Sequence, residues 1–421
     1  MSAFPESASR GPDSPLRIGQ RELVTMLALC QAMQALAIDA MLPALGDITR
    51  ELVVSDPNRR QLVVGLFLFG LAVGSLVPGP LADRYGRKPV LLASVVGYVL
   101  TTLLCAFVTD FTVMAVLRFV SGVLSAGLAV VPTAVVRDRF EGDRMARLQS
   151  IIAVIFMTVP MLAPSLGQAV LLVASWRWVF GVMAILGVGM GVWIALRLPE
   201  TLHPQYRQAI HLRNIAANFA LVVKTRSSIG YVLAGTCTMG VMWGYIQSCQ
   251  QLLVEHFGAG KAFPLIFGGM ALAMALANLA NSQLVERFGA RRLGHGALIA
   301  YTAFGLVQVW FAHQPHETLW QFIIVMTLSM ICSGFTGANF ASIALQPFAR
   351  IAGSASAVNT TIRNTVAAFI GAAVGQAYDG SARPLSIALV LAGISGIALV
   401  LWSDQGRLFR RVLPPGAVRD L

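Results

Sequence analysis

Long apolar runs recur along the whole chain, and short breaks that carry charged residues separate them. The twelve runs fall near residues 23–45, 61–82, 89–109, 111–136, 148–174, 178–198, 229–254, 262–285, 293–312, 318–347, 353–378 and 384–402. Each is long enough to cross about 30 Å of hydrocarbon as a helix. A helix also satisfies its own backbone hydrogen bonds, as the bilayer interior demands. The sequence therefore predicts an all-α integral membrane protein with twelve transmembrane helices.

The composition excludes a soluble protein. Of the 421 residues, 56% are hydrophobic and only 12% are charged, whereas soluble domains carry about 25% charged residues. The formal net charge of +12 does not indicate a nucleic-acid partner, because 23 of the 31 Lys and Arg residues lie in the tails and loops on the side of residue 1, and six lie on the opposite side. Such an excess marks the cytoplasmic side, so we expect both termini in the cytoplasm.

A break close to mid-chain divides the runs into two sets of six. It is basic and partly amphipathic, which is typical of a segment that lies on a membrane face. We therefore predict a cytoplasmic N-terminal tail, an N-terminal six-helix half, a cytoplasmic linker, a C-terminal six-helix half and a cytoplasmic C-terminal tail, at residues 1–22, 23–198, 199–228, 229–402 and 403–421.

An internal repeat supports two equivalent halves. The stretch "LADRYGRK" at 81–88 has a counterpart in "LVERFGAR" at 284–291, and both follow an even-numbered run. Two equivalent halves in one membrane chain are typical of a pseudo-symmetric transporter, in which two bodies rock about a central site. A membrane enzyme or receptor is disfavoured, because no His, Cys or acid cluster has catalytic or metal-binding spacing and no nucleotide-binding loop is present.

The stretch "GPLADRYGRK" at 79–88 resembles the signature loop of the major facilitator superfamily. The resemblance implies that Asp83 faces the start of the eleventh span near Gly353, and that the loop stabilises the outward-facing form. The gating residues it implies are Gly79, Asp83, Arg84, Gly86, Arg87 and Lys88, with Glu286 and Arg287 in the second half. Anchoring by basic residues alone is the alternative, but it explains neither the acid at 83 nor its repeat.

Further motifs narrow the resemblance to the twelve-span drug:proton antiporters of the bicyclomycin/chloramphenicol resistance group. They are "AIDAMLPAL" at 37–45, "LRFVSGVLSAG" at 117–127, "SWRWVF" at 175–180, "LPET" at 198–201 and "IAGSASA" at 351–357. The fifth-span antiporter motif keeps Pro160, Pro164 and Gly167, whereas Ala163 and Gln168 stand where that group has glycines. The resemblance implies the fold of that superfamily in a bacterial inner membrane.

Two charged residues inside the apolar runs are candidates for proton coupling. Asp39 is the one acid well inside a run, and a buried carboxylate normally marks an ion or proton pathway. Counting the helical rise along each run places Arg118 within about 5 Å of the same depth. We expect Asp39 to alternate between protonated and ionised forms, with Arg118 favouring the ionised one. The alternatives are that Asp39 only ends the first helix before Pro43, and that Arg118 binds backbone carbonyls of neighbouring spans.

Polar or amphipathic residues in the spans are candidates for substrate contacts. They are Gln31, Gln34, Trp243, Tyr245, Gln247, Asn339, Asn359 and Arg363. Transporter cavities are apolar with a few convergent polar groups, but hydrogen bonding between neighbouring spans is the alternative for each Gln and Asn. Arg363 lies near the bilayer midplane, where it either contacts an anionic part of the substrate or clamps backbone carbonyls.

These observations predict a secondary active transporter, specifically a proton-coupled exporter of small amphiphilic drugs or metabolites. A proton-coupled importer of a small organic solute is the alternative, although an importer would be expected to lack the span-five Pro/Gly motif. We expect a monomer that contacts its small-molecule substrate, protons and membrane lipid, and no nucleic acid. We also expect neither a metal nor a cofactor, since the proton gradient supplies the energy.

Overall fold

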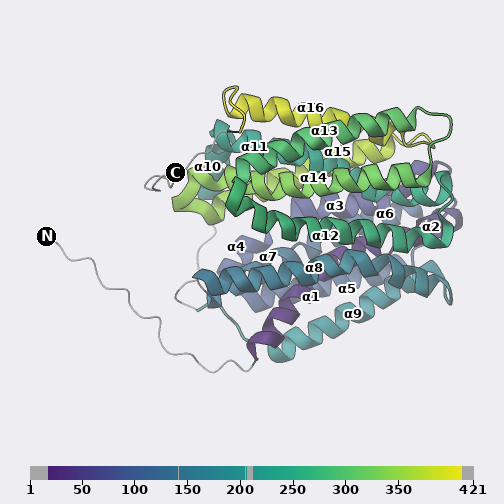
Figure 1. Ribbon diagram of the computed structural model, residues 1–421. Coiled ribbons are helices and arrows are strands. Elements are labelled where there is room, and N and C mark those ends of the chain that lie inside the picture. The colour runs from purple at the N-terminus through teal and green to yellow at the C-terminus, as the bar shows by residue number, and fades with distance from the viewer. Residues whose placement is uncertain (1–17, 141, 204, 206–211, 410–421) are drawn as a thin grey trace.

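The protein is a bundle of long helices that run side by side (Figure 1). The computed structural model describes residues 18–140, 142–203, 205 and 212–409, and in this part of the chain every long regular element is a helix. The first set comprises α1 (Gln20–Asp39), α2 (Leu45–Glu51), α3 (Leu62–Gly74), α4 (Pro78–Tyr85), α5 (Arg87–Ala106), α6 (Phe111–Ser125), α7 (Gly127–Arg139), α8 (Gly142–Leu171) and α9 (Trp176–Arg197).

The second set follows the linker helix. It comprises α10 (Leu212–Lys224), α11 (Arg226–Gln250), α12 (Phe263–Phe288), α13 (Ala290–Ala312), α14 (Leu319–Leu345), α15 (Ala352–Gln376) and α16 (Arg383–Ser403). Short connecting turns are η1 (Leu42–Ala44), η2 (Pro57–Gln61), η4 (Gln251–His256), η5 (Gly260–Ala262) and η6 (Gln346–Ile351). The linker helix α10 packs against α11 and α15.

Every predicted apolar run is occupied by a helix or a broken pair of helices. Among the described residues, ten helical segments are long and apolar enough to cross a membrane, or up to eleven if α3 and α4, which meet at a 47° bend, form one span. The run at 353–378 forms the 25-residue helix α15, which lies outside this set. Its polar residues lower its hydropathy, and it is covered by α11 and α3.

The internal repeat appears as the same backbone turn in both halves. Gly86 joins α4 to α5 with a φ of 106°, and Gly289 joins α12 to α13 with a φ of 82°. Glycine is the residue that adopts positive φ without steric cost. The two copies of the repeat therefore bend the chain in the same way, which agrees with two pseudo-symmetric halves.

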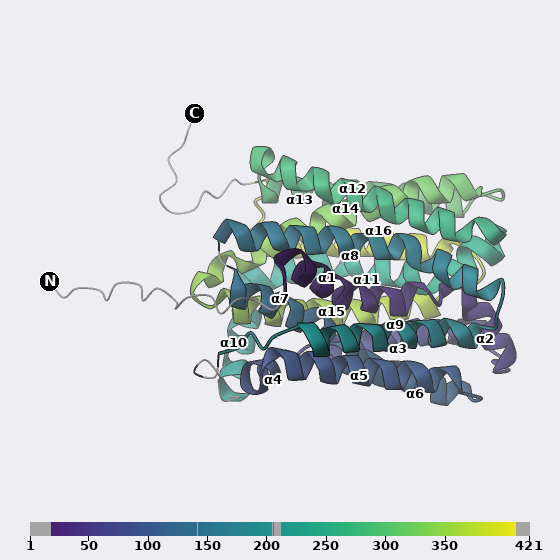
Figure 2. The same ribbon diagram turned by 90° about the horizontal axis from the view of Figure 1, so that it is seen from below.

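The two halves meet along two helix pairs, α8 with α12 and α3 with α15. Figures 1 and 2 both place α4 and α10 at one end of the bundle and α2 at the other. We refer to these as the α10 end and the α2 end. Most of the remaining contacts lie within a half, as in the packing of α5 on α9 and of α13 on α14.

Candidate functional site

Asp39 lies where the first span is broken. Helix α1 ends at this residue, and Pro43 in the following turn η1 has no backbone N–H with which to continue it. The Asp39 side chain is 5% exposed, and among the described residues it has no hydrogen-bond or ion-pair partner. An ionised carboxylate is costly to bury in such a place. The position therefore suits a group that carries a proton.

Arg118 is fully buried and holds the helices on either side of it through their backbones. Its Nε donates to the carbonyl of Val63 on α3 at 2.9 Å, and its Nη2 donates to the carbonyl of Ala37 on α1 at 2.8 Å. The second bond serves a helix end, where carbonyls lack partners within the helix. The guanidinium also lies 4.4 Å from the ring centre of Phe67. The carbonyl-binding alternative thus describes its contacts, and Arg118 reaches the backbone two residues before Asp39 rather than the carboxylate.

The span-five motif packs against this break. A Cβ added at Gly167 of α8 would stand 1.8 Å from the carbonyl oxygen of Ala40, the residue after Asp39. Pro160 and Pro164 lie inside α8, about two turns and one turn before this glycine, respectively. The sequence motif therefore allows α8 to approach the broken end of α1 closely. The structure brings together Asp39, Arg118 and Gly167, which lie far apart in the sequence.

The loop at 79–88 forms a polar cluster within its own half. Arg87 is 3% exposed, and its guanidinium donates to Asp83 at 2.5 Å and to Asp138 at 2.8 Å. The carboxylate of Glu200, from the "LPET" stretch, accepts from the backbone N–H groups of Arg87 and Lys88. It thus caps the first turn of α5, where a negative charge is favourable. Gly79 and Arg84 lie in α4, and Gly86 makes the turn.

The approach of Asp83 to the start of α15 stays a prediction, because the side chains of residues 349–354 lie outside those described. In the second half, Glu286 and Arg287 are exposed and have no hydrogen-bond or ion-pair partner among the described residues. Arg291, the repeat equivalent of Lys88, instead pairs with Asp404 at 2.8 Å.

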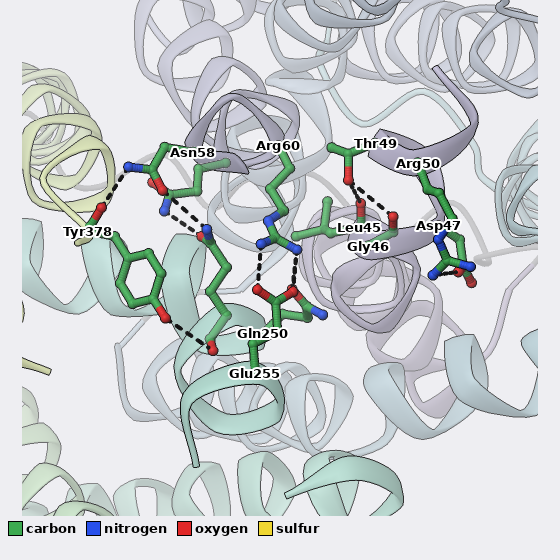
Figure 3. Close-up of polar contacts among 12 residues, drawn as sticks. Leu45, Gly46, Asp47, Thr49, Arg50, Asn58, Arg60, Gln250, Glu255 and Tyr378 are labelled. Carbon is green, nitrogen blue, oxygen red and sulfur yellow. Dashed lines mark hydrogen bonds and ion pairs between the residues drawn. The ribbon is translucent and has the colours of Figure 1, made fainter. Parts of the chain in front are cut away.

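A polar network joins the halves at the α2 end (Figure 3). Arg60 in η2 donates to both carboxylate oxygens of Glu255 in η4, at 2.5 and 2.7 Å, and to Gln250 at 3.1 Å. Arg60 itself is 6% exposed. Beside this pair, Asn58 donates to the backbone carbonyls of Gln376 and Tyr378, at 3.1 and 2.7 Å.

Further amide contacts extend this network. Gln376 returns a bond to the carbonyl of Asn58 at 3.0 Å, and Gln61 donates to Gln251 at 2.6 Å. The Tyr378 hydroxyl donates to the carbonyl of Gln251 at 3.4 Å. The α2 end is therefore held shut by contacts between the halves.

Three of the predicted substrate residues form hydrogen bonds to neighbouring spans. Gln34 donates to the carbonyl of Ser125 at 2.7 Å, and Asn339 donates to Asn281 at 2.8 Å. The Tyr245 hydroxyl donates to Met270, and its ring stacks on Phe267. For Gln34 and Asn339, such bonds between neighbouring spans are the alternative that the sequence left open.

The next candidates for substrate contacts are Gln31, Trp243 and Gln247. Gln31 and Trp243 are half-buried, and the Trp243 Cβ lies against Gly371 of α15. Gln247 is buried between Gly65 of α3 and Gly371, and its amide nitrogen has no hydrogen-bond partner in the described part of the chain. It therefore lies at the meeting point of the two halves.

Asn359 and Arg363 line a cavity of about 50 Å³ between α11, α14 and α15. The lining residues are Tyr231, Val232, Gly235, Gly337, Phe340, Ala341, Leu345, Ser356, Asn359, Thr360 and Arg363. Two predicted substrate residues therefore line a common cavity.

Several contacts that organise these sites were not predicted from the sequence. Asp138 and Glu200 hold the loop, and Asp404 joins Tyr231, His295 and Arg291 in a cluster at the α10 end. The pairing of Arg60 with Glu255 had a signal, because the two opposite charges flank apolar runs at the same membrane face. Within the described residues, no group of three or more His, Cys, Asp or Glu is placed to hold a metal ion.

The comparisons with known proteins agree on a family. The sequence model of the Major Facilitator Superfamily matches residues 27–372. A bicyclomycin resistance protein homolog of Haemophilus influenzae is 26% identical over 365 residues, which cover 86% of this chain and 91% of the relative. The multidrug resistance protein MdtL of Klebsiella pneumoniae is 28% identical over 324 residues, covering 76% and 80%. The crystal structure of the human organic anion transporter MFSD10 shares the fold, with a TM-score of 0.64, 16% identity and coverage of 92% and 100%.

Proposed function

Because the chain belongs to the major facilitator superfamily, we propose that it is a proton-coupled exporter of small amphiphilic drugs or metabolites that works by alternating access. The family is one of multi-span membrane transporters and not of enzymes. The names of the bicyclomycin and multidrug resistance relatives support export of drug-like compounds. The motifs in the first, fourth and fifth spans support coupling to protons, with no cofactor.

The burial of Asp39 without a partner, at the break in the first span, is the observation that carries this proposal. A carboxylate in this position is neutral when protonated and costly when ionised, so each protonation step changes the stability of the surrounding packing. Arg118 and Gly167 tie that packing to α3 and α8. Proton binding at Asp39 can thereby bias the two halves between their arrangements.

The proposed orientation follows the basic residues. The α10 end faces the cytoplasm of a bacterium, both termini lie inside, and the protein acts as a monomer in the inner membrane. On this orientation the α2 end, which contacts between the halves hold closed, faces outward. Asp83, Arg84, Arg87 and Lys88 form a gating loop, and the pairing of Asp83 with Arg87 inside one half is compatible with release of that loop from α15 in this state.

The experiment that tests the proposal measures uphill transport in vesicles of known orientation with an imposed proton gradient. The Asp39→Asn variant should insert normally and lose accumulation against the gradient, and Asp39→Glu, which keeps an ionisable group, should retain part of it. A variant Asp39→Asn that still concentrates substrate at the wild-type rate would contradict the assignment. Uptake into right-side-out vesicles driven by an inward proton gradient would establish the importer instead.

A further inference from the structure

One face of α15 carries a row of polar side chains that opens onto the cavity in the second half. Ser356, Asn359, Thr360 and Arg363 are spaced three, one and three residues apart, which places them on one face of a helix. The facing walls come from α11 and α14. There Gly337 supplies no side chain, and a Cβ added to it would meet nothing within 4 Å. The row therefore borders open space rather than a packed neighbour.

Among the residues that the structure describes, the polar side chains of this row have no hydrogen-bond partner. Asn359 is 9% exposed, and its amide nitrogen and its oxygen are both buried without a hydrogen bond. The Nε of Arg363 is also buried without a partner, and among the described residues no acid pairs with its guanidinium. Buried polar atoms are nearly always satisfied in proteins, and a lone charge this deep in a span is costly. Two such residues on adjacent turns indicate a ligand.

The charge around the cavity defines what that ligand is. No acidic residue is among those that line the cavity. One lining residue, Tyr231, binds an acid that is not itself in the lining. Its hydroxyl donates to Asp404 at 2.6 Å, and Asp404 is already paired with Arg291. The positive charge of Arg363 is therefore left without a counter-charge on its own side of the cavity wall.

We propose that this cavity is an anion subsite that receives a carboxylate, or an anionic group of similar size, from the transported molecule. The guanidinium of Arg363 and the amide nitrogen of Asn359 donate to the ligand oxygens, and the hydroxyls of Ser356 and Thr360 add further donors. A cavity of about 50 Å³ holds only the charged group, so the body of the ligand lies outside it. The inference rests on the proposed transport function and specifies its substrate class as carboxylated.

The test is a binding measurement on the purified full chain in a neutral detergent, without a proton gradient or transport. Benzoate and its uncharged isostere benzamide serve as probes, and the readout is the unfolding temperature. At about ten times its Kd, benzoate should raise the unfolding temperature of the wild type by about 2 °C, and benzamide should not. The shift should vanish in Arg363→Gln and in Gly337→Leu, which fills the cavity while leaving Arg363 in place. It should be unchanged in Arg292→Gln, which removes an exposed charge on α13.

Three outcomes would overturn the proposal. The first is the absence of a benzoate shift in the wild type, and the second is an equal shift in Arg363→Gln. The third is stabilisation by phosphatidylglycerol in mixed micelles that depends on Arg363 while benzoate has no effect, which would assign the site to a lipid headgroup. Because the assay needs no transport, its result is independent of the Asp39→Asn experiment, and either proposal can fail alone.

Discussion

At the scale of single residues, the chain depends on a few positions where only one side chain fits. Gly167 is the clearest, because its Cα faces the Ala40 carbonyl with no room for a methyl group. The same carbonyl follows Asp39 directly. The geometry at one glycine therefore connects the span-five motif to the residue proposed to carry the proton.

Replacing Gly167 with Ala should separate α8 from the broken end of α1. A Cβ 1.8 Å from a backbone oxygen cannot be accommodated without movement, and such overpacking costs about 1–3 kcal/mol. We expect a lower unfolding temperature and a loss of uphill transport. The matched control is Gly269→Ala in α12, where an added Cβ meets nothing within 4 Å. Equal transport by both variants would show that the close approach has no functional role.

Glu317 gives the fold a pH dependence outside the spans. Burial raises its pKa to about 7, which the hydrogen bond from Gln308 at 2.7 Å only partly opposes. Between the unfolded pKa near 4.5 and about 7, the folded state binds more protons than the unfolded state, so stability falls as pH rises through this window. The Glu317→Gln variant should lose this decline. Unfolding temperatures from pH 4.5 to 7.5 test it, and parallel curves for the two proteins would refute it.

The sequence located the buried charges of the first half but not the partners of Arg118. Asp39 and Arg118 were found because a charge in an apolar run is a strong signal, but the choice of the Ala37 and Val63 carbonyls by Arg118 depends on how each helix is rotated. The same limit applies to Gln34, since sequence spacing gives depth but not direction. The substrate and proton roles stay predictions.

At the scale of elements, the two halves share one backbone turn, but different contacts hold the helix that follows it. The glycine turn recurs at Gly86 and Gly289. In the first half the helix after this turn is capped by Glu200, whereas in the second half Arg291 in the corresponding helix pairs with Asp404. Only the turn could be predicted from the repeat, because the acids that bind the helix after it, Glu200 and Asp404, lie outside the repeat.

The contact between η2 and η4 should control opening at the α2 end. The Arg60→Glu variant places two acids together, and losing a partly buried pair costs about 1–2 kcal/mol, or a five- to thirty-fold shift in population. A cysteine at Trp243, at the interface, should then react faster with an impermeant maleimide added from the α2 side. The double variant Arg60→Glu with Glu255→Arg should restore the slow rate. Unaltered labelling in the single variant would show that the ion pair is dispensable.

At the scale of the whole molecule, the fold class was predicted from the sequence and is confirmed by the family match and the helical structure. Twelve apolar runs and a mid-chain break carried that prediction, because a bilayer leaves helices as the only open-ended option. Breaks within spans, such as the bend between α3 and α4, were harder to predict from the sequence. It also gave no guidance on which ends of the halves touch.

Alternating access requires the halves to part at the α2 end, so a covalent link there should stop transport. Cysteines replacing Asn58 and Gln376, joined by a short bismaleimide, should abolish turnover, since these residues bond across the interface. The control joins cysteines at Glu51 and Arg177, which pair within the first half. Four of the five native cysteines are buried and react poorly. Full activity after crosslinking of residues 58 and 376 would exclude movement at this end.

The network at the α2 end is built mostly from uncharged amides, and this limits how strongly external salt can affect it. Salt screens the attraction between exposed charges, most strongly beyond about a Debye length, but it scarcely affects amide–carbonyl bonds such as those of Asn58 and Gln376. On the proposed orientation, this end faces the compartment whose salinity follows the environment. The outer seal should therefore respond to external salt only through the Arg60–Glu255 pair, and the amide bonds should keep a rise in salinity outside the cell from opening a leak by itself.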